Sequence, residues 1–206
     1  MSQCEVTSMD ERFRGFLPVA IDIETGGFKP DTDAILELAG TLIGMNSDGW
    51  LYVGESYNFN IKPFEGANVE SASLEFTGID PDHPFRDAME EEVAFKNFFN
   101  LIRNEVRRQG CTKAILVGHN AHFDGSFLNA AVSRCNIKKN PFHPFTYFDT
   151  ATLAGLALGQ TVLAKACQEA EIEFDNSKAH SALYDSERTG LLFCEIINRW
   201  KKMESR

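Results

Sequence analysis

The sequence predicts one α/β domain, a mixed sheet flanked by helices, and two observations carry this prediction. Strand-like segments come first along the chain and then alternate with helical ones, an order typical of a sheet covered by helices. The length of 206 residues, with 43% hydrophobic and 24% charged residues, suits one folded domain and excludes wholesale disorder. We therefore expect a single domain over residues 1–206, in which residues 1–17 form a polar lead-in.

Five segments have the pattern of strands, with apolar and β-branched residues bounded by turn residues. They are residues 18–24, 34–44, 50–61, 114–118 and 145–148. The sequence Asn-Ser-Asp-Gly at residues 46–49 predicts a hairpin turn between the second and third strands.

One segment shows helical spacing most clearly, and residues 86–109 are therefore expected to form a helix that stops at Gly110. Its apolar residues at this spacing are Phe95, Phe98, Phe99, Ile102 and Val106. Further helices are expected over residues 123–135, 151–157, 160–171 and 183–201.

Targeting signals and metal-binding cysteine pairs are absent from the sequence. No N-terminal stretch resembles a signal peptide, and the longest uncharged run, residues 150–164, is shorter than the roughly 20 residues of a membrane span. The five cysteines form no C-x-x-C pair, and their spacing to the histidines fits no common zinc site. We expect free thiols in a reducing compartment, hence a cytoplasmic protein without a membrane partner.

Charge is unevenly distributed along the chain. The net charge of −10 argues against a protein that binds polyanions with its whole surface. Residues 65–95 hold nine acids and one base, whereas residues 101–143 hold seven bases and two acids. These segments form either two solvated faces, or the bases converge into one basic patch. The candidate residues for a basic patch are Arg12, Arg14, Arg107, Arg108, Lys113, Lys138 and Lys139.

Asp22 and Glu24 are the first candidate site residues. Residues i and i+2 of a strand point to the same face, so these carboxylates lie together on a segment that is otherwise apolar. Two neighbouring buried carboxylates repel each other unless a cation lies between them, and oxygen ligands favour Mg²⁺ or Mn²⁺. The plainer interpretation is an edge strand with a solvated acidic face.

Three later acids stand where site residues are often found. Asp124 follows the buried strand 114–118, and the carboxyl ends of strands are where α/β proteins bind ligands; a helix cap is the alternative. Asp149 follows the strand 145–148, and there the cap is favoured. His180 and Asp185 would lie about 140° apart on one helix, so they act together only if His180 precedes the helix.

Taken together, Asp22-x-Glu24, His119-Asn-Ala-His-Phe-Asp124 and His180-x₄-Asp185 resemble the three motifs of the DEDDh family of 3′→5′ exonucleases. The resemblance implies a ribonuclease H-like fold in which Asp22, Glu24, Asp124 and Asp185 hold two Mg²⁺ ions, with Mn²⁺ as an alternative. His180 matches the general base of the family, a role for which an imidazole is suited at neutral pH.

Other segments resemble one branch of this family, whose members trim the 3′ ends of tRNA, including the terminal A of CCA, and mature other stable RNAs. These segments are residues 12–16, 78–81, 140–145, 149–160, 163–167 and 179–185. The resemblance implies a homodimer that also degrades single-stranded DNA. Charge segregation together with the resemblance gives the hypothesis that the basic patch of one subunit binds the duplex part of tRNA while the 3′ tail reaches the active site of the other subunit.

Aromatic residues of this branch stack on the last bases of the RNA, and stacking suits single strands because their bases are free. The matching residues are Phe28, Phe76, Phe123 and Phe145, and core packing is the alternative. The family often has a Glu where this chain has Ala72, in a segment expected to be a loop, so the terminal-base preference stays open. The competing functions are a DNA-directed proofreading or repair exonuclease and a non-catalytic RNA-binding module.

Overall fold

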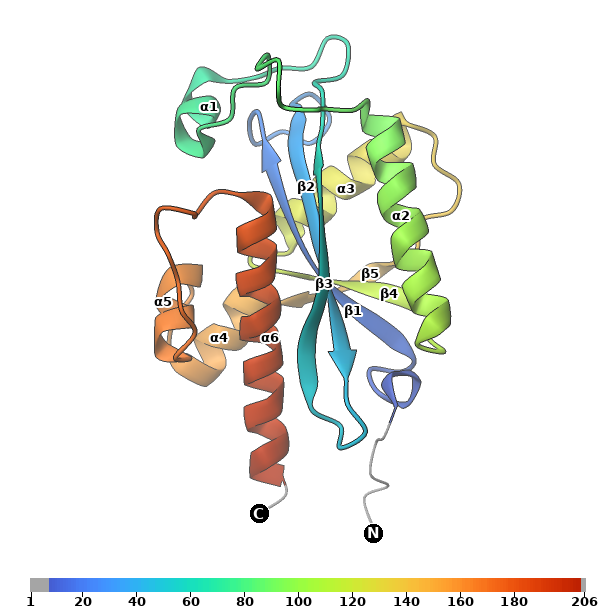
Figure 1. Cartoon of the computed structure of the whole chain (residues 1–206), viewed down its shortest axis with the longest axis vertical. Coiled ribbons are helices and arrows are strands. Elements are labelled where there is room, and N and C mark those ends of the chain that lie inside the picture. The colour runs from blue at the N-terminus through green and yellow to red at the C-terminus, as the bar shows by residue number, and fades with distance from the viewer. Residues whose placement is uncertain (1–7, 205–206) are drawn as a thin grey trace.

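The strands that were predicted assemble into one mixed sheet in the computed structural model, which describes residues 8–204 (Figure 1). They are β1 (Phe16–Thr25), β2 (Ile35–Met45), β3 (Leu51–Asn60), β4 (Lys113–Gly118) and β5 (Phe142–Asp149). Their order is β3-β2-β1-β4-β5. β1 is antiparallel to β2 and parallel to β4, which makes the sheet mixed, as predicted.

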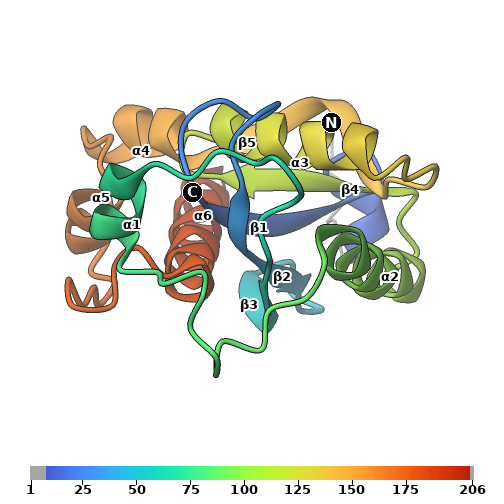
Figure 2. The ribbon, with the colours of Figure 1, turned by 90° about the horizontal axis from the view of Figure 1, so that it is seen from above.

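Helices cover both faces of this sheet, as expected for the α/β class. They are α1 (Ser71–Thr77), α2 (Glu91–Arg108), α3 (His122–Arg134), α4 (Thr150–Leu158), α5 (Leu163–Glu169) and α6 (Ala182–Glu204). Figure 2 shows β2 and β3 running between α2 and α6. A side chain on Gly40 would collide with Phe98 of α2, whereas the adjacent Thr41 hydrogen-bonds Ser186 of α6, so the two helices lie on opposite faces.

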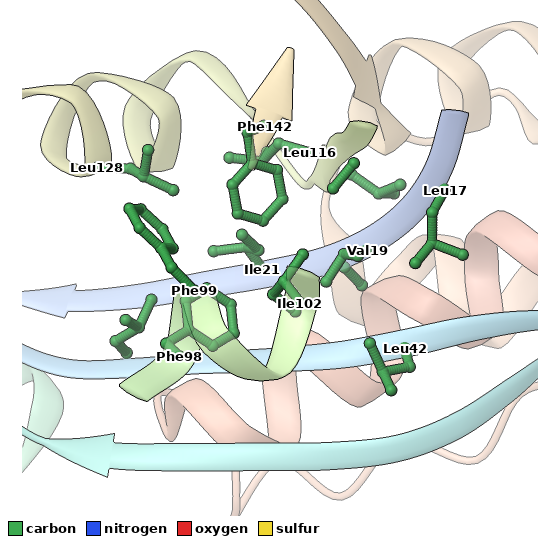
Figure 3. Packing of buried hydrophobic residues seen from close by; sticks show 14 of the residues in the cluster. Leu17, Val19, Ile21, Leu42, Phe98, Phe99, Ile102, Leu116, Leu128 and Phe142 are labelled. Atoms are coloured by element: carbon green, nitrogen blue, oxygen red, sulfur yellow. The ribbon is translucent and has the colours of Figure 1, made fainter. Parts of the chain in front are cut away.

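Much of the apolar core packs α2 and α3 against the sheet, and a second, smaller cluster lies among α4, α5 and α6. Figure 3 shows Phe98, Phe99 and Ile102 of α2 packed toward Val19 and Ile21 of β1, and all five side chains are fully buried. The helical spacing of the phenylalanines therefore reports the face of α2 that meets the sheet. Because side chains alternate along a strand, the even-numbered residues of β1 point to the other face, toward α6.

Three expectations need correction. The lead-in is shorter than predicted, because β1 begins at Phe16, and Phe13 packs its ring against Phe148 and Phe193; residues 1–7 lie outside the described part of the chain. The helix expected over 86–109 begins only at Glu91. The segment around Ala72 is the short helix α1 and not a loop.

Within residues 8–204, none of the helices combines the length and the apolar character that crossing a membrane requires.

Candidate active site

Asp22 and Glu24 point toward α6, on the face of β1 opposite the apolar core. Ile21 and Ile23 are buried against that core, so the predicted division of the strand into an acidic and an apolar face is confirmed. Glu37 of β2 lies directly across from Glu24 in the register of the two strands. Residues paired in register share a face, so a third carboxylate belongs to this surface.

The start of α6 brings His180 and Asp185 to the same place. His180 lies before the helix with a left-handed backbone (φ 67°), and Asp185 lies in the first turn, as the spacing required. The backbone N–H of His180 donates to Oδ2 of Asp185 over 3.0 Å. The N–H of Ala182 donates to Oε2 of Glu37 over 3.3 Å, which fastens the first turn of α6 to β2.

Asp124 reaches the same site from the first turn of α3. Its Oδ1 accepts a hydrogen bond of 3.1 Å from the backbone N–H of Ile23, the residue between Asp22 and Glu24. This bond gives the backbone N–H of Ile23 a hydrogen-bond partner, and it fixes the carboxylate of Asp124 beside those of Asp22 and Glu24.

These groups converge into one cluster. One ligand atom from each of Glu24, His180 and Asp185 lies within 4.8 Å of the others. Burial and the charges of Asp124, Glu24, Asp185 and Glu37 raise the pKa of Asp22 well above its usual value. Burial is also the main cause that raises the pKa of Glu24 to about 7 and of Asp124 to about 8, while Asp185 shifts upward too.

The cluster has the features of a divalent-cation site. Oδ1 of Asp185 is buried and has no hydrogen-bond partner among the described residues, although its other oxygen is bonded. Several repelling carboxylates offer oxygen ligands, the donors that hard divalent cations prefer, and a cation would relieve both the repulsion and the unpaired oxygen. The residues present therefore fit a divalent metal.

The metal-free protein is expected to lose stability as the pH rises from about 5 to about 8. In the unfolded chain these carboxyls release their protons near their usual pKa values, whereas the folded chain keeps protons on Glu24 and Asp124 up to pKa values of about 7 and about 8. Between these limits each rise in pH favours the unfolded state. We expect a fall of about 5 °C or more in the melting temperature in EDTA. A millimolar divalent cation should reverse the fall; a melting temperature that is flat over this range contradicts the account.

An aromatic cleft of about 570 Å³ leads to the carboxylates. Phe28, Phe76 and Phe123 line it together with Glu24, and Ala72 of α1 also faces it. Phe28 is 79% and Phe76 66% exposed, so neither ring serves the core. The ring centroids of Phe76 and His180 lie 4.0 Å apart, and those of Phe28 and Phe123 lie 6.3 Å apart.

Comparisons with known proteins show the family of the chain. A model of the RNase T exonuclease family matches residues 19–193 of the chain. Ribonuclease T from Yersinia enterocolitica is 55% identical over 199 residues, which is 97% of this chain and 93% of that protein. This chain belongs to the ribonuclease T family of exonucleases.

Solved structures of more distant proteins share the fold of this family member. Escherichia coli exonuclease I in complex with a dT13 oligonucleotide matches 92% of the chain with a TM-score of 0.68 and 19% identity, and the chain spans 43% of that protein. A full-length 3′-exonuclease matches 89% of the chain, and 61% of its own length, with a TM-score of 0.69 and 18% identity. The expected ribonuclease H-like fold is confirmed.

Phe145 lies apart from the other three candidate aromatics. It stands on β5, is 86% exposed, and does not line the aromatic cleft. The nearest described ring is that of His143, at 6.1 Å. The aromatic cleft therefore does not support a stacking role for Phe145, and that role stays a prediction.

Asp149 is the helix cap that the sequence favoured. Its side chain accepts hydrogen bonds from the backbone N–H groups of Ala151 and Asn120, and from the hydroxyl of Thr152. Burial alone would raise its pKa, but these hydrogen bonds hold the pKa of Asp149 below its usual value. The residue thus joins the start of α4 to the loop before α3.

Some of the candidate basic residues converge on a second cavity of about 560 Å³. Arg107, Lys113 and Lys139 line it, and Arg103 lines it with them. Arg108 instead forms a double hydrogen bond with Glu105 on its own helix. Arg12 and Arg14 lie over the rings of Phe13 and Phe16, while Lys138 lines a separate, smaller cavity with Lys139.

Glu37 and Asp33 are contributors to the site region that the sequence analysis did not single out. Glu37 is a carboxylate in the apolar segment Ile35–Met45, the same signal that identified Asp22. Asp33 gives no such signal, because it precedes β2 in a polar loop and its burial becomes visible only in the folded chain.

Proposed function

We propose that this protein is a 3′→5′ exoribonuclease that hydrolyses phosphodiester bonds at single-stranded 3′ ends and releases nucleoside 5′-monophosphates. The observation that carries the proposal is the convergence of Glu24, His180 and Asp185 with Asp22 and Asp124, at the side of a cleft walled by exposed aromatic rings. Membership in the ribonuclease T family supports the choice of reaction.

Asp22, Glu24, Asp124 and Asp185 are the residues that would hold two Mg²⁺ ions, with Mn²⁺ as an alternative. When bound, such ions stabilise the charges on the attacking and leaving oxygens of the phosphate and favour deprotonation of water. Asp124 is held for this task by Ile23, and Asp185 by His180.

His180 is the proposed general base, whose ring nitrogen takes a proton from the attacking water. The residue is exposed, and the hydrogen bond from its backbone to Asp185 keeps it beside the carboxylates. The ring of Phe76 contacts the imidazole at 4.0 Å and limits the directions in which it can point.

The proposed substrates are tRNA, trimmed at its CCA end, and other stable RNAs with unpaired 3′ ends. An aromatic cleft suits unpaired bases, because a base must leave its duplex before rings can stack on it. Single-stranded DNA offers the same ring faces, and the likeness to exonuclease I bound to dT13 supports DNA as a second substrate. A direct comparison of RNA and DNA substrates distinguishes RNA trimming from DNA proofreading.

Phe28→Ala and Phe76→Ala are each expected to raise KM for a short single-stranded oligonucleotide. Stacking is worth about 1–3 kcal/mol per base, so the rise should lie between about fivefold and one hundredfold. Steady-state kinetics on a 3′-labelled oligonucleotide measures this rise in KM. Phe85→Ala is the control, since Phe85 is even more exposed than Phe28 and Phe76 but lies outside the aromatic cleft. Equal effects of all three substitutions would contradict the stacking role.

We also propose that the protein acts as a homodimer in which the basic patch of one subunit holds the duplex part of tRNA. Replacing Arg107, Arg108 and Lys113 by Glu is expected to weaken tRNA binding by at least about tenfold, with little change in cleavage of a short oligonucleotide. Raising the salt concentration should reduce the difference in tRNA affinity between wild type and variant. Equal losses on both substrates would contradict this arrangement.

A labelled hairpin tests the proposed reaction. An RNA hairpin with a short 3′ overhang and a 5′ label is incubated with Mg²⁺ or with EDTA. We expect a Mg²⁺-dependent ladder that shortens from the 3′ end and stops near the duplex. Binding without shortening would point to a non-catalytic RNA-binding module. Faster shortening of a matched DNA hairpin would favour the DNA-directed exonuclease.

A further inference from the structure

The two exposed walls of the aromatic cleft come from separate segments of the chain. Phe28 lies in residues 26–34, here called the Phe28 loop, which connects β1 to β2. Phe76 lies in α1, which follows β3 and a stretch without regular structure; Figure 1 shows α1 beyond the end of β1. Contacts between these two segments must therefore fix the spacing of the rings of Phe28 and Phe76.

Asp33 is the residue that joins these segments. Its side chain is completely buried and accepts three hydrogen bonds. The backbone N–H of Lys29 donates to Oδ2 over 2.9 Å, within the Phe28 loop. The hydroxyl of Thr32 and the Nδ2 group of Asn68 donate to Oδ1 over 2.9 and 3.0 Å. The bond from Asn68 crosses to the segment that leads into α1.

Backbone hydrogen bonds run alongside this side-chain link. Asn68 donates to the carbonyl of Thr32 over 2.8 Å and accepts from Ala34 over 3.0 Å. The N–H of Glu70, at the start of α1, donates to the carbonyl of Gly26 over 2.7 Å. The two segments thus form a short two-stranded unit, with Asp33 buried inside it.

Gly27 shows how tightly the Phe28 loop closes around Asp33. A Cβ atom at Gly27 would lie 2.1 Å from Oδ2 of Asp33, which no side chain allows. Phe28 is held between this glycine and Lys29, whose N–H is bonded to the same carboxylate oxygen. The backbone on both sides of Phe28 is therefore held against the carboxylate of Asp33.

We propose that Asp33 is a positioning residue for substrate binding, one that holds Phe28 at a fixed spacing from Phe76 so that the terminal base fits between the walls of the aromatic cleft. This inference rests on the proposed function, in which Phe28 stacks on a base. Asp33 itself does not line the cleft and touches no reacting group. Its loss should therefore raise KM and leave kcat unchanged.

Asp33→Asn keeps the shape of the side chain but replaces one acceptor oxygen by an NH₂ group, so at least one of the three donors loses its partner. Asn68→Ala is the second variant. Asn68 is exposed, and its loss removes only the side-chain link between the two segments and leaves the backbone hydrogen bonds in place, so the protein should fold even if Asp33→Asn does not. Asp31→Asn is the matched control, an exposed carboxylate of the same loop.

The test is a double-mutant cycle with Phe28→Ala, measured as KM and kcat on a short single-stranded RNA. We expect Asp33→Asn and Asn68→Ala to raise KM about five- to twentyfold with kcat unchanged, and Asp31→Asn to behave as wild type. In the Phe28→Ala background neither substitution should raise KM further, because the ring that they position is gone. A merely structural role would give additive effects.

The outcomes separate the inference from the proposed function. Asp33 is not a positioning residue if Phe28→Ala raises KM and the Asp33 and Asn68 variants do not. The same holds if the effects of these variants on KM add to the effect of Phe28→Ala. In both cases the stacking role of Phe28 is retained. If Phe28→Ala leaves KM unchanged, the stacking proposal fails and the role of Asp33 fails with it. A fall in kcat at constant KM would also overturn the inference.

Discussion

Replacing Asp22 by asparagine is expected to abolish activity and to make the metal-free protein more stable. Burial makes the charge of Asp22 costly, and repulsion from the charges of Asp124, Glu24, Asp185 and Glu37 adds to that cost. Removing that charge relieves repulsion in the folded state, but it also takes one oxygen ligand from the metal site. We expect kcat to fall by about three orders of magnitude or more, roughly 4 kcal/mol of transition-state stabilisation.

Two measurements test the expected loss of activity and the expected gain in stability. Single-turnover kinetics gives the loss of rate, and thermal melting with EDTA or Mg²⁺ gives the stability of each form. The variant should melt higher than wild type in EDTA near pH 8 and should gain less from Mg²⁺. Asp48→Asn, an exposed acid in the β2–β3 turn, is the control for loss of one charge. A variant that keeps a tenth of the activity, or that melts lower in EDTA, contradicts the role of Asp22.

His180→Asn is expected to lower kcat without weakening metal binding. General-base catalysis contributes about 10²- to 10⁴-fold, and the fall should lie in that range. Asparagine is the right substitution because His180 has a left-handed backbone, which asparagine tolerates and branched residues do not. The stability gained on adding Mg²⁺ should persist, since all four carboxylates remain.

The control for this variant is His83→Asn, which removes an exposed histidine from the loop before α2. It should leave kcat unchanged. If His180→Asn abolishes the stabilisation by Mg²⁺, the imidazole is a ligand and not a base. If kcat stays within about threefold of wild type, another group removes the proton.

The sequence predicted the sheet and the long helices because their residues carry periodic patterns. Alternation in β1 and helical spacing in α2 both report which side chains face the core. The helix α1 escaped prediction because none of its residues is buried, so it has no apolar face to recognise. The start of α2 was misplaced because the guanidinium of Arg86 donates to the carbonyls of Ile61 and Leu36, which holds residue 86 outside the helix.

The site could be predicted as a set of residues, though not as an arrangement. Asp22 and Glu24 are recognisable because carboxylates interrupt an apolar strand, and the resemblance to the DEDDh motifs adds Asp124, His180 and Asp185. The links among them are long-range: Asp124 binds the backbone of Ile23, 101 residues away, and Glu37 binds Ala182, 145 residues away. No local pattern records such contacts. Asp33 therefore emerged only from the folded chain, whereas Glu37 carries the same sequence signal as Asp22 but was not singled out.

The most direct test of the central claim identifies the first product. An RNA with a single-stranded end and a label in its 3′-terminal nucleotide is mixed with Mg²⁺ and the wild type or Asp22→Asn protein, and the released label is identified chromatographically. We predict that wild type releases a labelled nucleoside 5′-monophosphate from the first turnover and that the variant releases none. Release of the label in an oligonucleotide, release of a labelled nucleoside without a 5′-phosphate, or equal release by both proteins would contradict 3′→5′ hydrolysis at this carboxylate cluster.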